Sequence, residues 1–97
     1  MKFQLKLTNA GFAELQNWLK YMFPMVKEKE LYTVYFSLIE VNKKFYEQSF
    51  ILKSEYKFKL TYSQAAAILD AYTNFPAPPG HFPFVANVCA EFHSKIC

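Results

Sequence analysis

The chain has 97 residues, of which 53% are hydrophobic and 20% aromatic, and its 11 basic and 8 acidic residues give a formal net charge of +3. Such a composition excludes a disordered chain, and such a length allows one hydrophobic core but not two, so we expect a single domain over residues 1–97. Every basic residue is lysine. Without the planar guanidinium of arginine, base-specific reading of a nucleic acid is disfavoured.

The first predicted element is a strand over residues 2–8, because apolar and polar side chains alternate there with a period of two. Thr8 is suited to cap the helix that follows, and Pro24 is expected to end or kink that helix. Apolar positions recur in the helix at intervals of three and four residues, as one buried face requires. They are Phe12, Leu15, Trp18, Leu19, Met22 and Phe23.

A similar series begins at residue 55. Residues 55–60 again alternate between polar and apolar, and Thr61 with Gln64 forms the T-x-x-Q pattern of a helical capping box. The helix expected after Thr61 stops at the sequence NFPAPP, much as the first helix is expected to stop at MFP. Strand, capping threonine, helix and Phe-Pro stop therefore recur about 53 residues apart.

The two series predict the fold class. We expect a mostly helical α+β protein made of tandem strand-helix-helix units, in the order β-α-α-β-α-α, with a small two-stranded sheet. The units, residues 1–50 and 51–97, suggest an internal repeat about a pseudo-twofold axis. Convergence explains the same pattern equally well, because threonine is a common helix cap after any strand.

The segment from about residue 28 to residue 50 carries apolar side chains on two adjoining faces of a predicted helix. At 100° per residue these faces merge into an apolar arc of roughly 220°, about twice what one-sided burial needs. We therefore expect cover on both sides, from the rest of the domain or from a second chain. One of the two faces is our candidate partner interface, which consists of Tyr32, Phe36, Ile39, Tyr46 and Phe50.

The same segment can be interpreted as a β-hairpin. Residues 31–41 and 45–53 are rich in strand-forming side chains and would turn at the sequence NKK. We favour the helix, because its spacing of three and four residues runs unbroken from Leu31 to Phe45, whereas a hairpin buries only half of the aromatic rings.

The end of the chain is predicted to be one more amphipathic helix. The sequence NFPAPPGHFP at residues 74–83 leads into it, and we interpret the P-x-x-P at 76–79 as a stiff connector because no basic residue flanks it. One face of the helix is formed by Phe84, Val85, Val88, Cys89, Phe92 and Ile96.

Cys89 and His93 are the best candidates for side-chain chemistry, because one helical turn brings a thiol next to a base or to a second metal ligand. A zinc site needs two more ligands, and only His81 and Cys97 remain for that role. The acidic residues lie mostly on expected solvent faces and form no convergent pair. We therefore predict a core cysteine and a boundary histidine, with no catalytic residue, no metal and no cofactor.

The lysines of the two strands form the second candidate surface. Lys2, Lys6, Lys53, Lys57 and Lys59 alternate with the apolar positions, so pairing of the strands would gather them on one side of the sheet. That side could hold the phosphates of a nucleic acid, with an affinity that falls with salt. We favour the simpler interpretation, in which these lysines keep exposed strands soluble and prevent pairing between chains.

These observations predict a non-enzymatic protein. We expect a small intracellular protein-interaction or oligomerisation module, most simply a homodimer, with non-specific nucleic-acid binding by the lysine side as the alternative. A cytoplasmic location fits two cysteines too far apart on a helix for a disulfide and a beginning without an apolar signal core. Four prolines interrupt the uncharged residues 71–90, so we expect no membrane span and no membrane partner.

Overall fold

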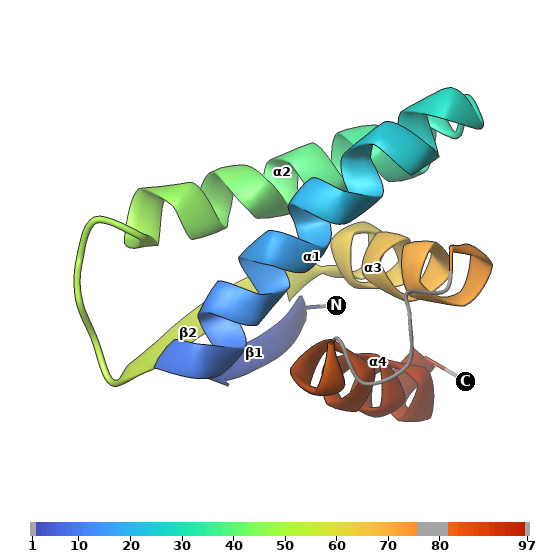
Figure 1. Cartoon of the computed structure of the whole chain (residues 1–97). Helices are drawn as coiled ribbons and strands as arrows, with labels where there is room; N and C mark the ends of the chain where they lie inside the picture. Colours follow the sequence, from blue (N-terminus) through green and yellow to red (C-terminus); the bar gives the residue numbers. More distant parts are fainter. Residues whose placement is uncertain (1, 76–81, 97) are drawn as a thin grey trace.

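The computed structural model describes residues 2–75 and 82–96 and forms two strands and four helices within them (Figure 1). In chain order these are β1 (Lys2–Thr8), α1 (Asn9–Glu28), α2 (Tyr32–Gln48), β2 (Glu55–Thr61), α3 (Tyr62–Asn74) and α4 (Pro83–Ile96). The predicted α+β fold, mostly helical with a two-stranded sheet, is confirmed. The P-x-x-P at 76–79, His81 and Cys97 lie outside the described residues, and the internal repeat stays a prediction.

The two strands pair antiparallel, with Leu5 opposite Phe58 and Lys6 opposite Lys57. The predicted alternation is confirmed, because one side of the sheet is buried along both strands. Its members are Phe3, Leu5, Leu7, Tyr56, Phe58 and Leu60. Helix α1 crosses over the sheet in Figure 1, and α3 follows directly from β2 and packs on both strands.

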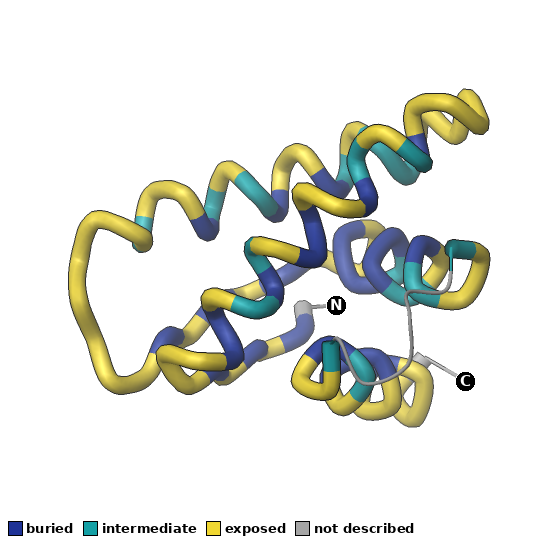
Figure 2. Tube along the Cα trace, in the orientation of Figure 1, coloured by how far each residue is buried: buried dark blue, intermediate teal, exposed yellow. Residues whose placement is uncertain are grey.

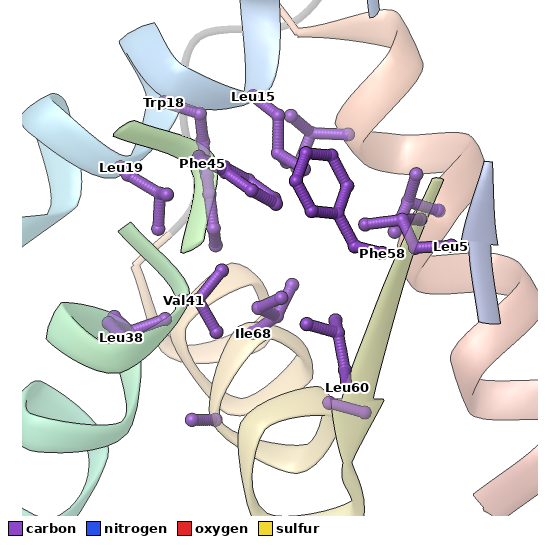
Figure 3. Packing of buried hydrophobic residues seen from close by; sticks show 14 of the residues in the cluster. Leu5, Leu15, Trp18, Leu19, Leu38, Val41, Phe45, Phe58, Leu60 and Ile68 are labelled. Atoms are coloured by element: carbon purple, nitrogen blue, oxygen red, sulfur yellow. The ribbon is translucent and has the colours of Figure 1, made fainter. Parts of the chain in front are cut away.

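A group of aromatic rings joins the sheet to α1 and α2. Phe12 stacks on Tyr56 with ring centroids 4.1 Å apart, and Phe45 of α2 lies 4.5 Å from Phe58 (Figure 3). Such ring pairs add about 0.5–1.5 kcal/mol to the stabilisation expected from their buried area. The buried residues of both strands and all four helices, dark blue in Figure 2, belong to a single cluster, so one core joins the elements.

Helix α1 begins where the sequence predicts but runs past its proline. Thr8 Oγ1 accepts a hydrogen bond from the main-chain N–H of Gly11 at 3.1 Å, which is the expected N-cap. Pro24 lies inside the helix, which continues to Glu28. The last turn persists because it buries Val26 completely, so that packing outweighs the hydrogen bond that proline cannot make.

Helix α2 confirms the helical interpretation of the central segment and excludes the hairpin. It is shorter than expected, since Tyr32–Gln48 are helical while Phe50 lies in the loop that follows. Leu38, Val41 and Phe45 are fully buried on its inner face.

Gln64 links the start of α3 to α2. Its main-chain N–H donates to Thr61 Oγ1 at 3.2 Å and its Oε1 accepts from the main-chain N–H of Thr61 at 3.0 Å, which completes the predicted capping box. Gln64 Oε1 also accepts from Lys44 Nζ at 3.1 Å, and Gln64 Nε2 donates to Glu40 Oε2 at 3.3 Å. A side chain only 4% exposed thus has its polar atoms bonded to two other elements.

Both edges of the two-stranded sheet have neighbours. Lys44 Nζ of α2 donates to the main-chain carbonyl of Lys59 at 2.7 Å and so occupies an acceptor on β2. On the other side α4 lies beside β1, with the Phe92 ring 5.8 Å from that of Phe3. These neighbours hinder the approach of another strand to the edges of the sheet.

Glu14 of α1 holds the beginning of α4. Its Oε2 accepts a hydrogen bond from the main-chain N–H of Val85 at 2.9 Å, in the first turn of that helix. A carboxylate is favourable there because the N-terminal N–H groups carry partial positive charge. The sequence places the acidic residues mostly on solvent faces, but Glu14 joins α1 to α4 through a residue 71 positions later in the chain.

Among the described helices, none has the length and apolarity needed to cross a membrane.

Replacing Gln64 by alanine should lower the free energy of unfolding by about 1–3 kcal/mol, because the main-chain N–H of Thr61, Lys44 and Glu40 each lose a partner. Urea unfolding followed by the fluorescence of Trp18, the single tryptophan and fully buried, measures the loss. Ser63→Ala, at an exposed position of the same turn, is the control and should change stability by less than about 0.5 kcal/mol. Equal effects of the two substitutions would contradict the proposed role of Gln64.

Candidate functional site

The outer face of α2 is uncovered. All five residues of the candidate partner interface are exposed, at 51% for Tyr32, 59% for Phe36, 38% for Ile39, 60% for Tyr46 and 72% for Phe50. Cover on both sides of α2 was expected, but within the described residues the chain covers only the inner side. The outer side is the exposed strip along α2 in Figure 2.

Six exposed positions along α2 and just beyond its end follow a regular spacing. Steps of four, three, four, three and four residues lead from Tyr32 to Phe50, and they include Lys43, which the sequence analysis did not single out. We call these six positions the α2 seam: Tyr32, Phe36, Ile39, Lys43, Tyr46 and Phe50. A repeat averaging 3.5 residues is the spacing by which one helix meets another along its length.

Contacts between neighbouring rings order the seam. The rings of Tyr32 and Phe36 lie 6.5 Å apart, and Phe36 also meets the edge of Tyr35 at 5.7 Å. Beyond the helix end, Phe50 packs edge-to-face on Tyr46 at 5.0 Å and so continues the line of the helix. Rings held by their neighbours lose less side-chain entropy when a partner covers them.

Charged side chains accompany the seam. Lys43 is exposed and forms no hydrogen bond or ion pair with another described residue, and the same holds for Glu47. A single lysine within an apolar helical seam weakens association but restricts how the partner can align. Beside the seam, a shallow cavity of about 200 Å³ lies between α2 and α3, with Val34 and Ala67 among its lining residues.

The lysine side of the sheet is smaller than expected. Lys6 and Lys57 are directly opposite, Lys59 is opposite Gln4, and all three lysines are exposed. Lys57 pairs weakly with Glu55, at 3.9 Å. Like charges opposite each other destabilise a sheet slightly, so this pair does not serve the stability of the fold.

Of the other two predicted lysines, Lys53 is not part of this group. Lys53 Nζ donates to Gln48 Oε1 at 3.2 Å, which directs it to the end of α2 instead of the sheet. The main chain of Lys2 pairs with Thr61, but its side chain lies outside the described residues. The structure therefore brings together three of the five lysines.

Cys89 is a core residue, as predicted. It is 2% exposed, and burial raises the pKa of its thiol from 9.0 to about 12, so the thiol is protonated at neutral pH. His93, one turn later, is exposed, and both border an open cavity of about 240 Å³ between α3 and α4. Within residues 2–75 and 82–96, no three His, Cys, Asp or Glu side chains lie close enough to hold a metal ion.

Alkylation should show that Cys89 is not an activated nucleophile. Because the thiolate is the reactive form, a pKa of about 12 leaves roughly a thousandfold fewer thiolates at pH 8 than the ordinary value of 9.0. In the Cys97→Ser variant, iodoacetamide should therefore modify Cys89 far more slowly in the native protein than in urea. Mass spectrometry over time measures both rates, and comparable rates would show an accessible thiol.

No protein-family model, curated protein or solved structure matches this chain. No residue therefore receives a role from a relative. The α2 seam and the lysine side of the sheet are the two surfaces from which a function can be inferred.

Proposed function

We propose that this protein is a non-enzymatic interaction module that associates with a second copy of itself through the α2 seam. The observation that supports the proposal is the exposure of a line of aromatic rings with helix-pairing spacing, on a helix whose opposite face is buried. Monomeric proteins rarely leave a large continuous apolar patch in water unless it has a function.

The size of the seam agrees with a weak, reversible dimer. An aromatic side chain buries about 150–250 Å², and roughly half to two thirds of each seam ring is exposed, so four rings offer roughly 500 Å² per copy. Two copies would then bury about 1,000 Å², which is near the lower limit for a specific interface. An obligate dimer would need considerably more.

A second copy is favoured because the four aromatic rings of the seam are spaced symmetrically along it, although its two central residues, Ile39 and Lys43, differ. Tyr32 and Phe50 lie nine residues on either side of Val41, and Phe36 and Tyr46 lie five residues on either side. A twofold axis near Val41 would therefore place ring against ring at both levels. The cytoplasmic location belongs to the same proposal, supported by a buried free thiol at Cys89.

Light scattering across a dilution series tests the proposal. The mass should fall from dimer to monomer on dilution, and Phe36→Glu with Tyr46→Glu should weaken association at least tenfold, since about 1.4 kcal/mol per factor of ten is easily lost at central rings. The control is Phe84→Glu, which alters an exposed ring of α4 and should leave association unchanged. A mass equal to the monomer at every concentration would end the proposal.

Binding of a nucleic acid by the lysine side is the second candidate, because Lys6 and Lys57 face each other on an exposed side of the sheet at a small cost in stability. Tyr62, 49% exposed directly after β2, is a ring on which a base could stack.

Fluorescence anisotropy with a labelled single-stranded DNA tests this candidate. Binding should weaken with added salt and should be lost in the Lys57→Glu/Lys59→Glu variant, because two phosphate contacts are replaced by repulsion. Lys20→Glu/Lys27→Glu, at two exposed positions of α1, is a control with the same change of net charge at a different place. Absence of binding at low salt, or equal loss in the control, would exclude the lysine side.

A further inference from the structure

The loop between α2 and β2 exposes three large apolar side chains in a row. Phe50, Ile51 and Leu52 are 72%, 51% and 88% exposed, and Leu52 is the most exposed large hydrophobic residue described. The loop stands at one end of the molecule, at the left in Figure 1, and is exposed along its length in Figure 2. We call these three residues the apolar tip.

Hydrogen bonds hold the tip in place. The main-chain N–H of Ile51 donates to the main-chain carbonyl of Gln48 at 3.2 Å. The carbonyl of Ile51 accepts from the Tyr56 hydroxyl at 2.9 Å. That hydroxyl also accepts from the N–H of Lys53 at 3.2 Å, while the Lys53 carbonyl accepts from Asn9 Nδ2 at 3.2 Å. Because the Tyr56 ring is buried in the core, the tip is anchored to the rigid part of the fold.

This arrangement suits an apolar medium better than water. Main-chain groups that enter a lipid layer need partners within the protein, and here several of them already have such partners. The exposed side chains offer only hydrocarbon and one aromatic ring. Ile51 and Leu52 have no flat face on which a nucleic-acid base could stack.

The shape of the tip favours a fluid partner over a rigid one. The tip consists of three consecutive exposed residues of a loop, which a folded protein could cover only with a fitted pocket, whereas acyl chains rearrange around them. The α2 seam differs in this respect, because its side chains lie in one line along a helix and suit a second helix.

Lysines near the tip match the negative charge of a membrane surface. Lys53 follows Leu52 directly, and Lys57 and Lys6 lie opposite each other at the near end of the sheet. Glu55 pairs with Lys57 at 3.9 Å and offsets part of this charge, so the apolar contact supplies most of the affinity and the lysines add a preference.

We propose that the apolar tip inserts into the surface of membranes that contain anionic lipid and holds the protein there without crossing the bilayer. The sequence led us to expect no membrane partner, but that expectation rested on the absence of a membrane-spanning segment and did not concern binding at the membrane surface. The tip shares Phe50 with the α2 seam, but Ile51 and Leu52 are not members of the seam, so substitutions at these two residues test membrane binding separately from self-association.

Flotation with lipid vesicles tests the proposal. The protein should float with vesicles of phosphatidylcholine and phosphatidylserine, and at least tenfold less strongly with phosphatidylcholine alone. The Ile51→Ser/Leu52→Ser variant should bind at least tenfold more weakly than the unchanged protein, since two hydrocarbon side chains are lost without a change of charge. Leu31→Ser, at an exposed apolar residue at the other end of α2 and outside both the seam and the tip, is the control and should bind as the unchanged protein does.

Thermal unfolding by circular dichroism should show that the tip variant folds normally, because both side chains are largely exposed. No binding to the anionic vesicles, equal binding to both vesicle types, or equal binding by the tip variant would overturn the proposal. A tip variant that loses dimer mass but not vesicle binding would also overturn it and would assign the tip to the protein interface. Loss of dimerisation in the seam variants alone would bear on the proposed function and would leave the proposal of membrane binding by the tip unchanged.

Discussion

The position of Phe45 between Phe12 and Phe58 fixes the rotation of α2, and most of the surface follows from it. The Phe45 ring lies 5.6 Å from Phe12 and 4.5 Å from Phe58, so it contacts α1 and the sheet at once. Successive residues of a helix are turned by 100°, so a helix that places Phe45 and Val41 inward must place Tyr46 and Ile39 outward. The exposure of the seam is therefore a consequence of the core and does not depend on local flexibility.

Local patterns predicted those parts of the fold that local chemistry decides. Thr8 and Thr61 cap their helices because a hydroxyl three residues before an N–H is sufficient for a cap, whatever lies around it. The path of α1 beyond Pro24 could not be read in this way, because the burial of Val26 against distant elements outweighs a local rule. The same holds for Glu14, whose partner Val85 becomes a neighbour only in the folded chain.

The candidate surfaces were predictable to the extent that they follow a period. Helical spacing predicted the apolar residues of the seam. It did not predict Lys43, because only apolar residues were selected for the candidate interface, although Lys43 occupies the same line of the helix. Ile51 and Leu52 had no such signal, since loop residues follow no period and their exposure depends on hydrogen bonds made by Tyr56. The alternating pattern places Lys53 with the strand lysines, whereas in the folded chain its Nζ binds Gln48 at the end of α2, a contact that the pattern does not predict.

The neighbours at the two edges of the sheet limit the kind of assembly that this chain can form. A strand with free main-chain groups can add further strands without end, which leads to fibres, whereas a helical surface that matches itself closes after two copies. Here Lys44 holds a carbonyl of β2 and α4 flanks β1, so growth through the sheet is hindered while α2 stays open. In the proposed dimer, a chain with 20% aromatic residues would associate through one helix and stop at two copies.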